Sequence, residues 1–326
     1  MRVLVLGGSA FVGRALVQDA LDRGADVSVF NRGTRPVPER VTQLTGDRLA
    51  GDLEALSGGE WDVVVDTWSA TPTAVADTAG LLSGRAGAYV YVSSGSVYRF
   101  PSPAGSDEGF PVVEVDAAEG PTDYAGNKRG GELAAETFDG PTVLARAGLV
   151  LGPWSNVGRL QWWLERISKG GHVLAPGPPD TSIQAIDNRD LAGWCLDAGL
   201  AGLEGAYNLV SPMGRWTVQD LLEACVDVTA SNALLRWVEP DVIEAAGIKP
   251  WTDLPIWLPP GEIHDAMHMF DTSKAESLGL VTRDLRQTVE DTWQWLCDVG
   301  APELRPDLSH GLAPDIEAKV LKGIGS

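Results

Sequence analysis

Short apolar runs alternate with stretches of helical periodicity through the first half of the chain. Several of the runs are too continuously apolar to have a face in water, which is typical of strands buried on both sides of a sheet. Strands that alternate with helices favour right-handed crossovers and a parallel sheet. The pattern therefore predicts an α/β fold built on a doubly wound parallel sheet. The predicted strands are RVLVL (2–6), DVSVF (26–30), WDVVVD (61–66), GAYVYVSS (87–94) and TVLARAG (142–148).

The alternation ends after Gly152. Glycine and proline cluster at 170–180, and ten of the twelve tryptophans lie beyond residue 150. We expect one domain over residues 1–155, to which a segment near 183–210 returns, and a smaller, irregular C-terminal lobe over 156–298. Residues 299–326 are expected to form a C-terminal tail with one short amphipathic stretch.

Composition and charge narrow the classes of partner. A hydrophobic fraction of 44% and a charged fraction of 21% fit an ordinary globular protein. The 25 Lys and Arg face 45 Asp and Glu, and the formal net charge of −20 repels phosphate backbones and anionic membranes. We therefore expect no nucleic-acid partner and no membrane partner.

The cysteine spacing and the first residues of the chain indicate in which cellular compartment we expect the protein. Cys195, Cys225 and Cys297 are far apart and lack CxxC spacing, so neither a disulfide framework nor a zinc site is indicated. Met1 leads almost directly into the first strand, and no apolar run approaches the roughly 18 residues of a membrane span. A cytoplasmic location is the expectation.

A glycine-rich loop follows the first predicted strand and opens a helix. Such a loop brings backbone close to a pyrophosphate, and the helix N-terminus supplies oriented N–H groups, as in Rossmann-type dinucleotide sites. One methyl group stands at the middle position where glycine is usual, so we expect the phosphate to lie slightly farther out. A plain strand-to-helix turn is the alternative. The loop residues are Gly7, Gly8, Ser9, Ala10, Phe11, Val12 and Gly13.

The end of the second strand bears on which cofactor binds. An NAD site usually has a carboxylate about 20 residues after the loop, whereas this strand ends in Asn31 and Arg32, with Arg35 close behind. A guanidinium can hold a 2′-phosphate bidentately, which favours NADP over NAD. The alternative is that both arginines are solvated loop charges. Asp47 is a candidate adenine contact or a turn aspartate.

Three residues form a candidate catalytic group. Tyr124 and Lys128 are four apart, so on a helix they share one face, and an ammonium beside a phenol is expected to lower the phenol pKa toward neutrality. Ser94 closes a buried strand at the end where ligands bind in open α/β sheets. The alternatives are a strand-end turn serine and a helical ion pair between Lys128 and Glu132.

Together these motifs resemble the short-chain dehydrogenase/reductase superfamily, in its extended, atypical branch of NAD(P)-dependent epimerases, dehydratases and reductases. The resemblance implies that Ser94, Tyr124 and Lys128 are the catalytic triad, with Tyr124 as proton donor or acceptor and Lys128 also holding the nicotinamide ribose. It also implies hydride exchange at a substrate hydroxyl or carbonyl, and a homodimer as one assembly. The motifs are GGSAFVG, VSSGSVY (92–98), YAGNK (124–128), LARAGLVLGP (144–153), IDNRDLA (186–192), YNL (207–209) and FDTSKAESLGL (270–280).

One departure puts a nucleotide sugar in doubt. Sugar-nucleotide epimerases usually have an arginine seven residues before the aspartate matched here by Asp190, and this chain has Ile183 there. Arg159 or Arg189 could compensate. The loop and VFNRG also resemble a subgroup that includes chloroplast RNA-binding relatives without the triad, but the triad residues are present here.

The sequence therefore leaves three functions open. The first is an NADP-dependent oxidoreductase that reduces a carbonyl, or oxidises the alcohol, of a small organic substrate bound mainly by the C-terminal lobe; a natural-product-type substrate is the expectation if the tryptophans line its pocket. The second is an NAD-dependent sugar or sugar-nucleotide epimerase or dehydratase. The third is a non-catalytic dinucleotide-binding regulator or RNA-associated protein. The tryptophans of the lobe could line an apolar substrate pocket or pack in its core.

A metal site is not predicted. His264 and His268 stand four apart with carboxylates nearby, but a zinc helix of HExxH type needs glutamate directly after its first histidine, and Asp265 is there.

Overall fold

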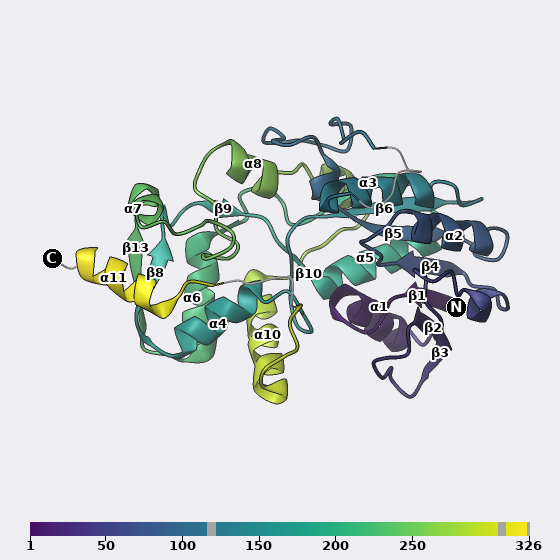
Figure 1. Cartoon of the computed structure of the whole chain (residues 1–326), viewed down its shortest axis with the longest axis horizontal. Coiled ribbons are helices and arrows are strands. Elements are labelled where there is room, and N and C mark those ends of the chain that lie inside the picture. Colours follow the sequence, from purple (N-terminus) through teal and green to yellow (C-terminus); the bar gives the residue numbers. More distant parts are fainter. Residues whose placement is uncertain (116–121, 306–310, 325–326) are drawn as a thin grey trace.

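A seven-stranded sheet lies at the centre of the larger part of the molecule (Figure 1). The structure is a computed structural model that describes residues 1–115, 122–305 and 311–324. All neighbouring strands pair in parallel, in the order β11-β6-β5-β4-β1-β2-β3. The predicted doubly wound α/β fold is confirmed. The strands are β1 (Arg2–Leu6), β2 (Asp26–Asn31), β3 (Val41–Thr45), β4 (Val63–Asp66), β5 (Tyr89–Ser94), β6 (Thr142–Ala147) and β11 (Gly205–Leu209).

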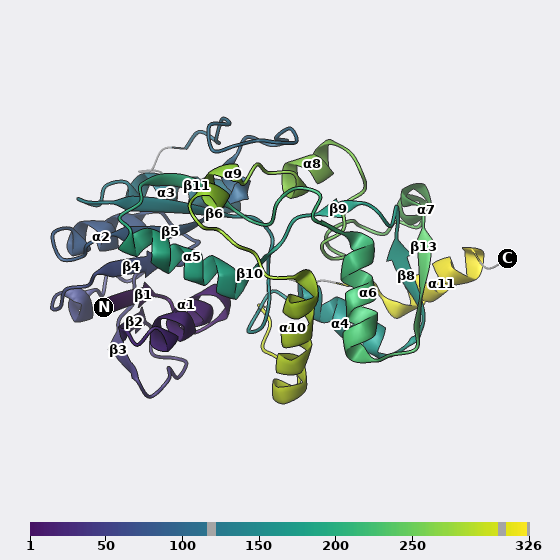
Figure 2. The same cartoon turned by 180° about the vertical axis from the view of Figure 1, so that it is seen from behind.

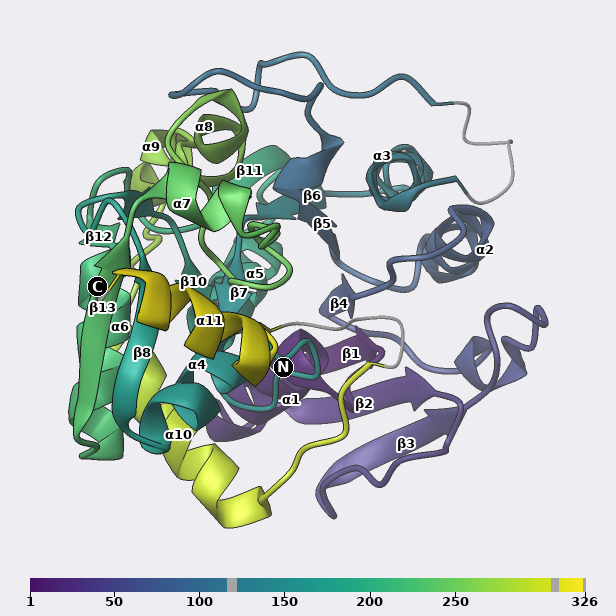
Figure 3. The ribbon, with the colours of Figure 1, turned by 60° about the vertical axis from the view of Figure 1, so that its left-hand side comes forward.

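Both faces of the sheet are covered, as continuous apolar strands require. Val3 and Val5 of β1 point to one face, where they pack with α1 (Phe11–Asp22) and α5 (Asn188–Leu200). Leu4 and Leu6 point to the other, covered by α2 (Thr73–Leu82) and α3 (Tyr124–Ala135). Figure 3 looks nearly along the sheet and shows the two helix pairs on opposite sides.

A second core lies beside the sheet domain (Figure 2). Three helices pack together there, α4 (Arg159–Ser168), α6 (Val218–Thr229) and α10 (Leu285–Val299). A parallel pair of strands, β8 (Gly171–Pro176) and β13 (Ala233–Val238), adds to this lobe. Trp163 and Trp257 are fully buried in its core, and Nε1 of Trp163 donates to the Pro255 carbonyl at 2.7 Å.

The C-terminal segment contributes to this second core. Helix α11 (Pro314–Ile324) packs on β8, and Leu312 and Val320 are buried among the core residues. Glu317 accepts hydrogen bonds from Arg166 Nε at 2.7 Å and from Leu174 N at 3.0 Å. The described part of the expected tail is therefore anchored, and residues 306–310 and 325–326 lie outside the described residues. The domain boundaries themselves stay a prediction.

Short elements complete the described chain. None of its helices has the length and apolar character needed to cross a membrane. The short elements are η1 (Glu54–Leu56), η2 (Gly95–Val97), β7 (Val150–Leu151), β9 (Ser182–Ile183), β10 (Ile186–Asp187), β12 (Trp216–Thr217), α7 (Pro240–Ala245), α8 (Glu262–His268) and α9 (Ser273–Ser277).

Candidate active site

Two adjoining cavities lie at the carboxyl ends of the strands, the edge where open α/β sheets bind ligands. The larger has a volume of about 650 Å³ and the smaller about 460 Å³. Both volumes are in the range of ligand pockets. Four residues line both cavities, so the two cavities adjoin beside the glycine loop. They are Ala10, Thr67, Ser69 and Asn156.

The glycine loop separates the two cavities and needs its glycines. Gly7 and Gly8 have φ of +124° and +81°, in the region that side chains disfavour. A Cβ on Gly13 would lie 2.6 Å from the Gly8 amide nitrogen, so helix α1 packs directly on the loop. Gly7 and Ser9 line the smaller cavity, Phe11, Val12 and Gly13 line the larger, and Ala10 lines both. Gly8 packs behind the loop, against Val29.

The smaller cavity gathers the candidate cofactor residues of the second strand. Asn31, Arg32, Arg35 and Asp47 all line it. Asn31 Nδ2 donates to Ser9 Oγ at 3.3 Å, which ties the strand end to the glycine loop. Asp47 Oδ1 accepts from the Leu49 amide at 2.9 Å, so this aspartate also stabilises its own turn.

The two arginines differ in their surroundings. Arg35 forms a salt bridge of 2.8 Å with Glu303, so part of its charge is already compensated. Within the described residues Arg32 has no hydrogen bond or salt bridge from its side chain. Arg32 is therefore the better placed of the two to meet an anionic ligand.

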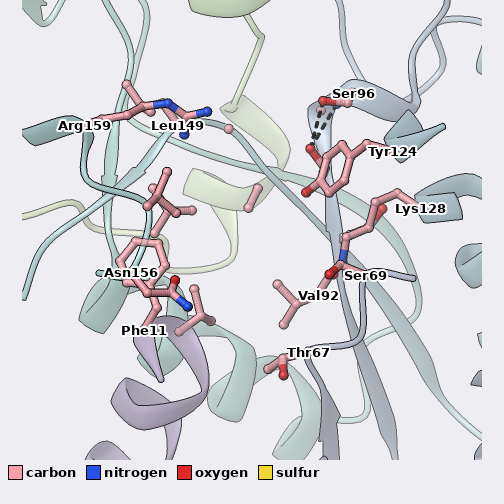
Figure 4. Close-up of a pocket in the computed structure, with 18 of the residues that line it drawn as sticks. Phe11, Thr67, Ser69, Val92, Ser96, Tyr124, Lys128, Leu149, Asn156 and Arg159 are labelled. Carbon is pink, nitrogen blue, oxygen red and sulfur yellow. Dashed lines mark hydrogen bonds between the residues drawn. The ribbon is translucent and has the colours of Figure 1, made fainter. Parts of the chain in front are cut away.

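Ser94 and Tyr124 line the larger cavity from different elements, and Figure 4 shows the Tyr124 ring and Lys128 on one side of this cavity. Ser94 is the last residue of β5, and its Oγ accepts a hydrogen bond from the Ser96 amide at 3.2 Å. Ser94 therefore also stabilises the turn at the end of the strand, which was the alternative role for this serine. Tyr124 is the first residue of α3, which Asp123 caps by accepting from the Gly126 amide at 2.8 Å. The cap fixes the helix start, and with it the position of the phenol.

Lys128, one turn along α3, is 3% exposed and reaches into the same cavity. Its Nζ donates to the backbone carbonyls of Trp68 at 2.7 Å and Val92 at 2.6 Å and lies over the Tyr91 ring. Burial lowers the pKa of this ammonium to about 7, because the favourable charges of Asp66 and Glu132 offset only part of the desolvation. Lys128 thus exchanges a proton near neutrality.

The expected lowering of the Tyr124 pKa does not occur. Desolvation by the pocket walls raises the pKa, and a hydrogen bond with Ser94 and the charge of Arg159 oppose the rise. The Lys128 ammonium is directed at backbone carbonyls rather than at the phenol. Since Tyr124 is 51% exposed, water reaches the ring and the rise is smaller than full burial would give.

Glu132 does not neutralise Lys128 by the helical ion pair that was the alternative. Its carboxylate accepts from Arg146 Nε at 2.8 Å and Nη2 at 3.0 Å, from Arg129 at 2.8 Å and from Ser93 Oγ at 2.7 Å. These bonds tie α3 to strands β5 and β6. Glu132 therefore supports the helix that carries Tyr124 and Lys128.

Sequence reasoning did not find several lining residues. Asn156, Ser96 and Arg305 line the larger cavity. Of the tryptophans considered for a substrate pocket, Trp251 lines this cavity, while Trp163 and Trp257 are buried in the second core. Arg305 comes from the segment expected to be a tail, so only the fold reveals it.

The paired histidines of α8 bond to backbone. His268 Nδ1 accepts from the Gln184 amide at 3.2 Å, which leaves Nε2 to donate to the Ile256 carbonyl at 3.0 Å. His264 Nε2 lies 2.7 Å from the Ser182 carbonyl. Across residues 1–115, 122–305 and 311–324, no group of three or more His, Cys, Asp or Glu is arranged to hold a metal ion.

Comparisons with known proteins bear mainly on the fold. No protein-family model matches the chain. A 3-beta-hydroxysteroid dehydrogenase from Mycolicibacterium neoaurum is 40% identical over 68 residues, a match that spans 20% of this chain and 19% of that relative's length.

Solved structures match over nearly the whole chain. The UDP-glucose 4-epimerase of Thermus thermophilus, in complex with NAD, is 20% identical with a TM-score of 0.64, covering 92% of this chain and 100% of that one. The Bordetella bronchiseptica enzyme WbmG, also with NAD, is 18% identical with a TM-score of 0.67, covering 95% and 98%. The UDP-glucuronic acid 4-epimerase of Bacillus cereus, with NAD, is 16% identical with a TM-score of 0.66, covering 92% and 100%. These matches show that this chain shares its fold with the three NAD-bound structures.

Proposed function

We propose that this chain is an enzyme that uses a nicotinamide dinucleotide to exchange a hydride at a hydroxyl-bearing carbon of a small substrate. The observation that carries the proposal is the convergence of Ser94, Tyr124 and Lys128 in a cavity that continues past the glycine loop into a second, arginine-lined cavity. A dinucleotide is long enough to need both cavities. A purely structural role would not require three polar side chains to meet in an open pocket.

The residues present fit such a cofactor. The cradle at Gly7 and Gly13 has no room for a Cβ, since one on Gly7 would lie 2.3 Å from Thr67 Oγ1. The Ala10 methyl group lines the cleft without closing it, because the cavities adjoin at this residue. The first turn of α1 faces the larger cavity; the Phe11 amide donates to the Trp154 carbonyl at 3.2 Å, so the next amides of the turn, those of Val12 and Gly13, would meet a pyrophosphate.

Each polar side chain has a defined task in this proposal. The bound nicotinamide supplies or accepts the hydride. Ser94 donates a hydrogen bond to the substrate oxygen, and Tyr124 passes a proton to or from that oxygen. Lys128, with its pKa of about 7, holds or releases a proton beside the nicotinamide ribose. Because the pKa of Tyr124 is raised from its ordinary value of 10, the phenol holds its proton at neutral pH before the substrate binds.

Epimerase or dehydratase chemistry is the version that the comparisons favour, because the similar solved structures include epimerases in complex with NAD. The second candidate is an NADP-dependent carbonyl reductase. Arg32 in the smaller cavity, in place of the usual carboxylate, favours that cofactor.

A titration of purified protein with NADH and NADPH, followed by tryptophan emission, tests the cofactor proposal. Any nucleotide released on denaturation is identified in parallel. Retained NAD supports the epimerase version, and at least about tenfold tighter NADPH binding, lost in Arg32→Ser, supports the reductase. Failure to bind either nucleotide contradicts both.

The catalytic proposal is tested by Tyr124→Phe against the matched control Tyr207→Phe, whose hydroxyl donates to the Glu204 carbonyl at 3.0 Å outside the cleft. Reduction of added cofactor, or interconversion of substrate, is measured with UDP-glucose, UDP-glucuronic acid and a 3β-hydroxysteroid. We expect Tyr124→Phe to lose roughly a hundredfold or more in turnover with cofactor affinity within about threefold. Equal activity in Tyr124→Phe and the wild type would refute the assignment.

A further inference from the structure

Among the described residues, the lining of the larger cavity has no carboxylate, although the protein is strongly acidic. The chain has 45 Asp and Glu against 25 Lys and Arg, yet no acidic residue is among those that line this cavity in the described structure. Three cationic residues do line it, Lys128, Arg159 and Arg305. The local charge thus opposes that of the whole molecule. Such a pocket attracts anions and repels cations.

Arg159 is the cation whose hydrogen-bonding capacity is unused. Its Nε is buried without a hydrogen-bond partner in the described structure, and its guanidinium lies over the Trp251 ring, 4.8 Å from the centroid. Arg305, whose amide donates to the Asn156 carbonyl, adds a like charge nearby. Burial and that charge lower the Arg159 pKa to about 10. An anion bound beside Arg159 would offset the influence of burial and of the Arg305 charge on the guanidinium, and it would accept hydrogen bonds from the guanidinium N–H groups.

The guanidinium stands across the cavity from the catalytic phenol. Figure 4 shows Arg159 on the wall opposite Tyr124, with open space between them. Each group influences the pKa of the other electrostatically, so both act on the same space. Ile183, at the position where the resemblance implies a diphosphate-binding arginine, is instead 1% exposed in the second core. The cavity thus places the Arg159 guanidinium and the Tyr124 phenol on facing walls of one space.

We propose that Arg159, with Arg305, binds a compact anionic group of the substrate, a carboxylate or a phosphate monoester, close to the carbon that Tyr124 serves. The substrate is then a small hydroxy or oxo acid, or its phosphate counterpart. This inference rests on the proposed function and specifies its substrate class.

The test uses three ring compounds of similar shape that differ in charge. Benzoate, phenyl phosphate and the neutral benzamide are titrated into protein saturated with whichever nicotinamide nucleotide it binds, and binding is followed by calorimetry. We expect at least one anion to bind about tenfold or more tightly than benzamide, because a hydrogen bond to a charged group contributes that much. Benzoate and phenyl phosphate report separately on the carboxylate and the phosphate.

Variants assign the effect to one side chain. Arg159→Gln should remove the preference for the anion, Arg159→Lys should retain much of it, and the control Arg286→Gln, an exposed residue paired with Asp227, should leave it intact. Equal binding of the three compounds by the wild type, or a preference that survives Arg159→Gln, would overturn the inference. Nucleotide affinity is measured on the same samples, so loss of the proposed function, seen as no nucleotide binding, is distinguished from loss of this inference alone.

Discussion

The effect of the buried Lys128 ammonium on the free energy of unfolding can be tested quantitatively, because burying this charge destabilises the folded protein. Replacement by methionine keeps an unbranched side chain, one atom shorter than that of lysine, and removes the charge. The wild-type amine donates to two carbonyls, and a neutral amine still has the two N–H groups that these bonds need. Deprotonation in the folded state therefore breaks neither bond. The pH dependence of stability then reports on the charge alone.

The sign follows from the two pKa values. The pKa is about 7 in the folded protein against an ordinary value of 10.5 in the unfolded chain. Between these values the unfolded chain holds a proton that the folded protein has released, so the free energy of unfolding rises with pH. The slope contributed by Lys128 is about 1.4 kcal/mol per pH unit, and the rise from pH 7 to 10 is about 4 kcal/mol. Below pH 7 the full cost is present and constant.

Urea unfolding at intervals from about pH 6 to 10 measures this effect as the difference between the wild type and Lys128→Met. We expect the wild type to gain stability on the variant through the alkaline range. Lys169→Met, at an exposed position after α4, is the matched control and should give a curve parallel to the wild type. Parallel curves for the wild type and Lys128→Met would show that the ammonium is not desolvated, and the reasoning would fail.

Two further predictions concern the glycine cradle and a buried imidazole. Gly13→Ala forces a Cβ against the loop backbone, so we expect nucleotide affinity to fall by about tenfold or more and stability by about 1–3 kcal/mol. Gly80→Ala, with open space at its helical position, should keep the affinity and gain up to about 1 kcal/mol. Burial lowers the pKa of His268 to about 4 from 6.5, so the unfolded chain binds the proton first and stability is lost as pH falls through this range. His268→Gln should remove about 3 kcal/mol of that acid sensitivity in unfolding titrations, and an unchanged profile would contradict the burial argument.

The sheet could be predicted from the sequence because its central strands are continuous runs of apolar residues. The run at β1 (Arg2–Leu6) is buried on both faces and reads as continuously apolar. Strand β3 (Val41–Thr45) gave a weaker signal because it lies at the edge of the sheet and three of its five residues are exposed. Strand β11 (Gly205–Leu209) was foreseen only as part of a returning segment, since pairing with β6 is a long-range event.

The candidate site was predictable in its residue types but not in its electrostatics. Spacing placed Tyr124 and Lys128 on one helix face, and strand direction placed Ser94 beside them. The pKa directions depend on which groups exclude water and on charges brought close by the fold, such as Asp66 beside Lys128 and Arg159 beside Tyr124, which no local pattern encodes. Arg305 reaches the cavity from a segment far along the chain, so its presence there required the fold.

The charged side chains inside the molecule differ in whether they have a partner of opposite charge. Each buried carboxylate of the described chain forms a salt bridge with an arginine, as the cost of burying an unpaired charge requires. Two cations contrast with these carboxylates. Lys128, which is buried, and Arg159, which is half-buried, form no salt bridge with a carboxylate in the described structure, and both line the cavity that contains Tyr124. Stability alone would favour an apolar side chain at either position. Their retention is explained if the charge they need arrives with the ligands. The paired carboxylates are Asp66 with Arg48, Glu132 with Arg146, Asp187 with Arg189, and Glu317 with Arg166.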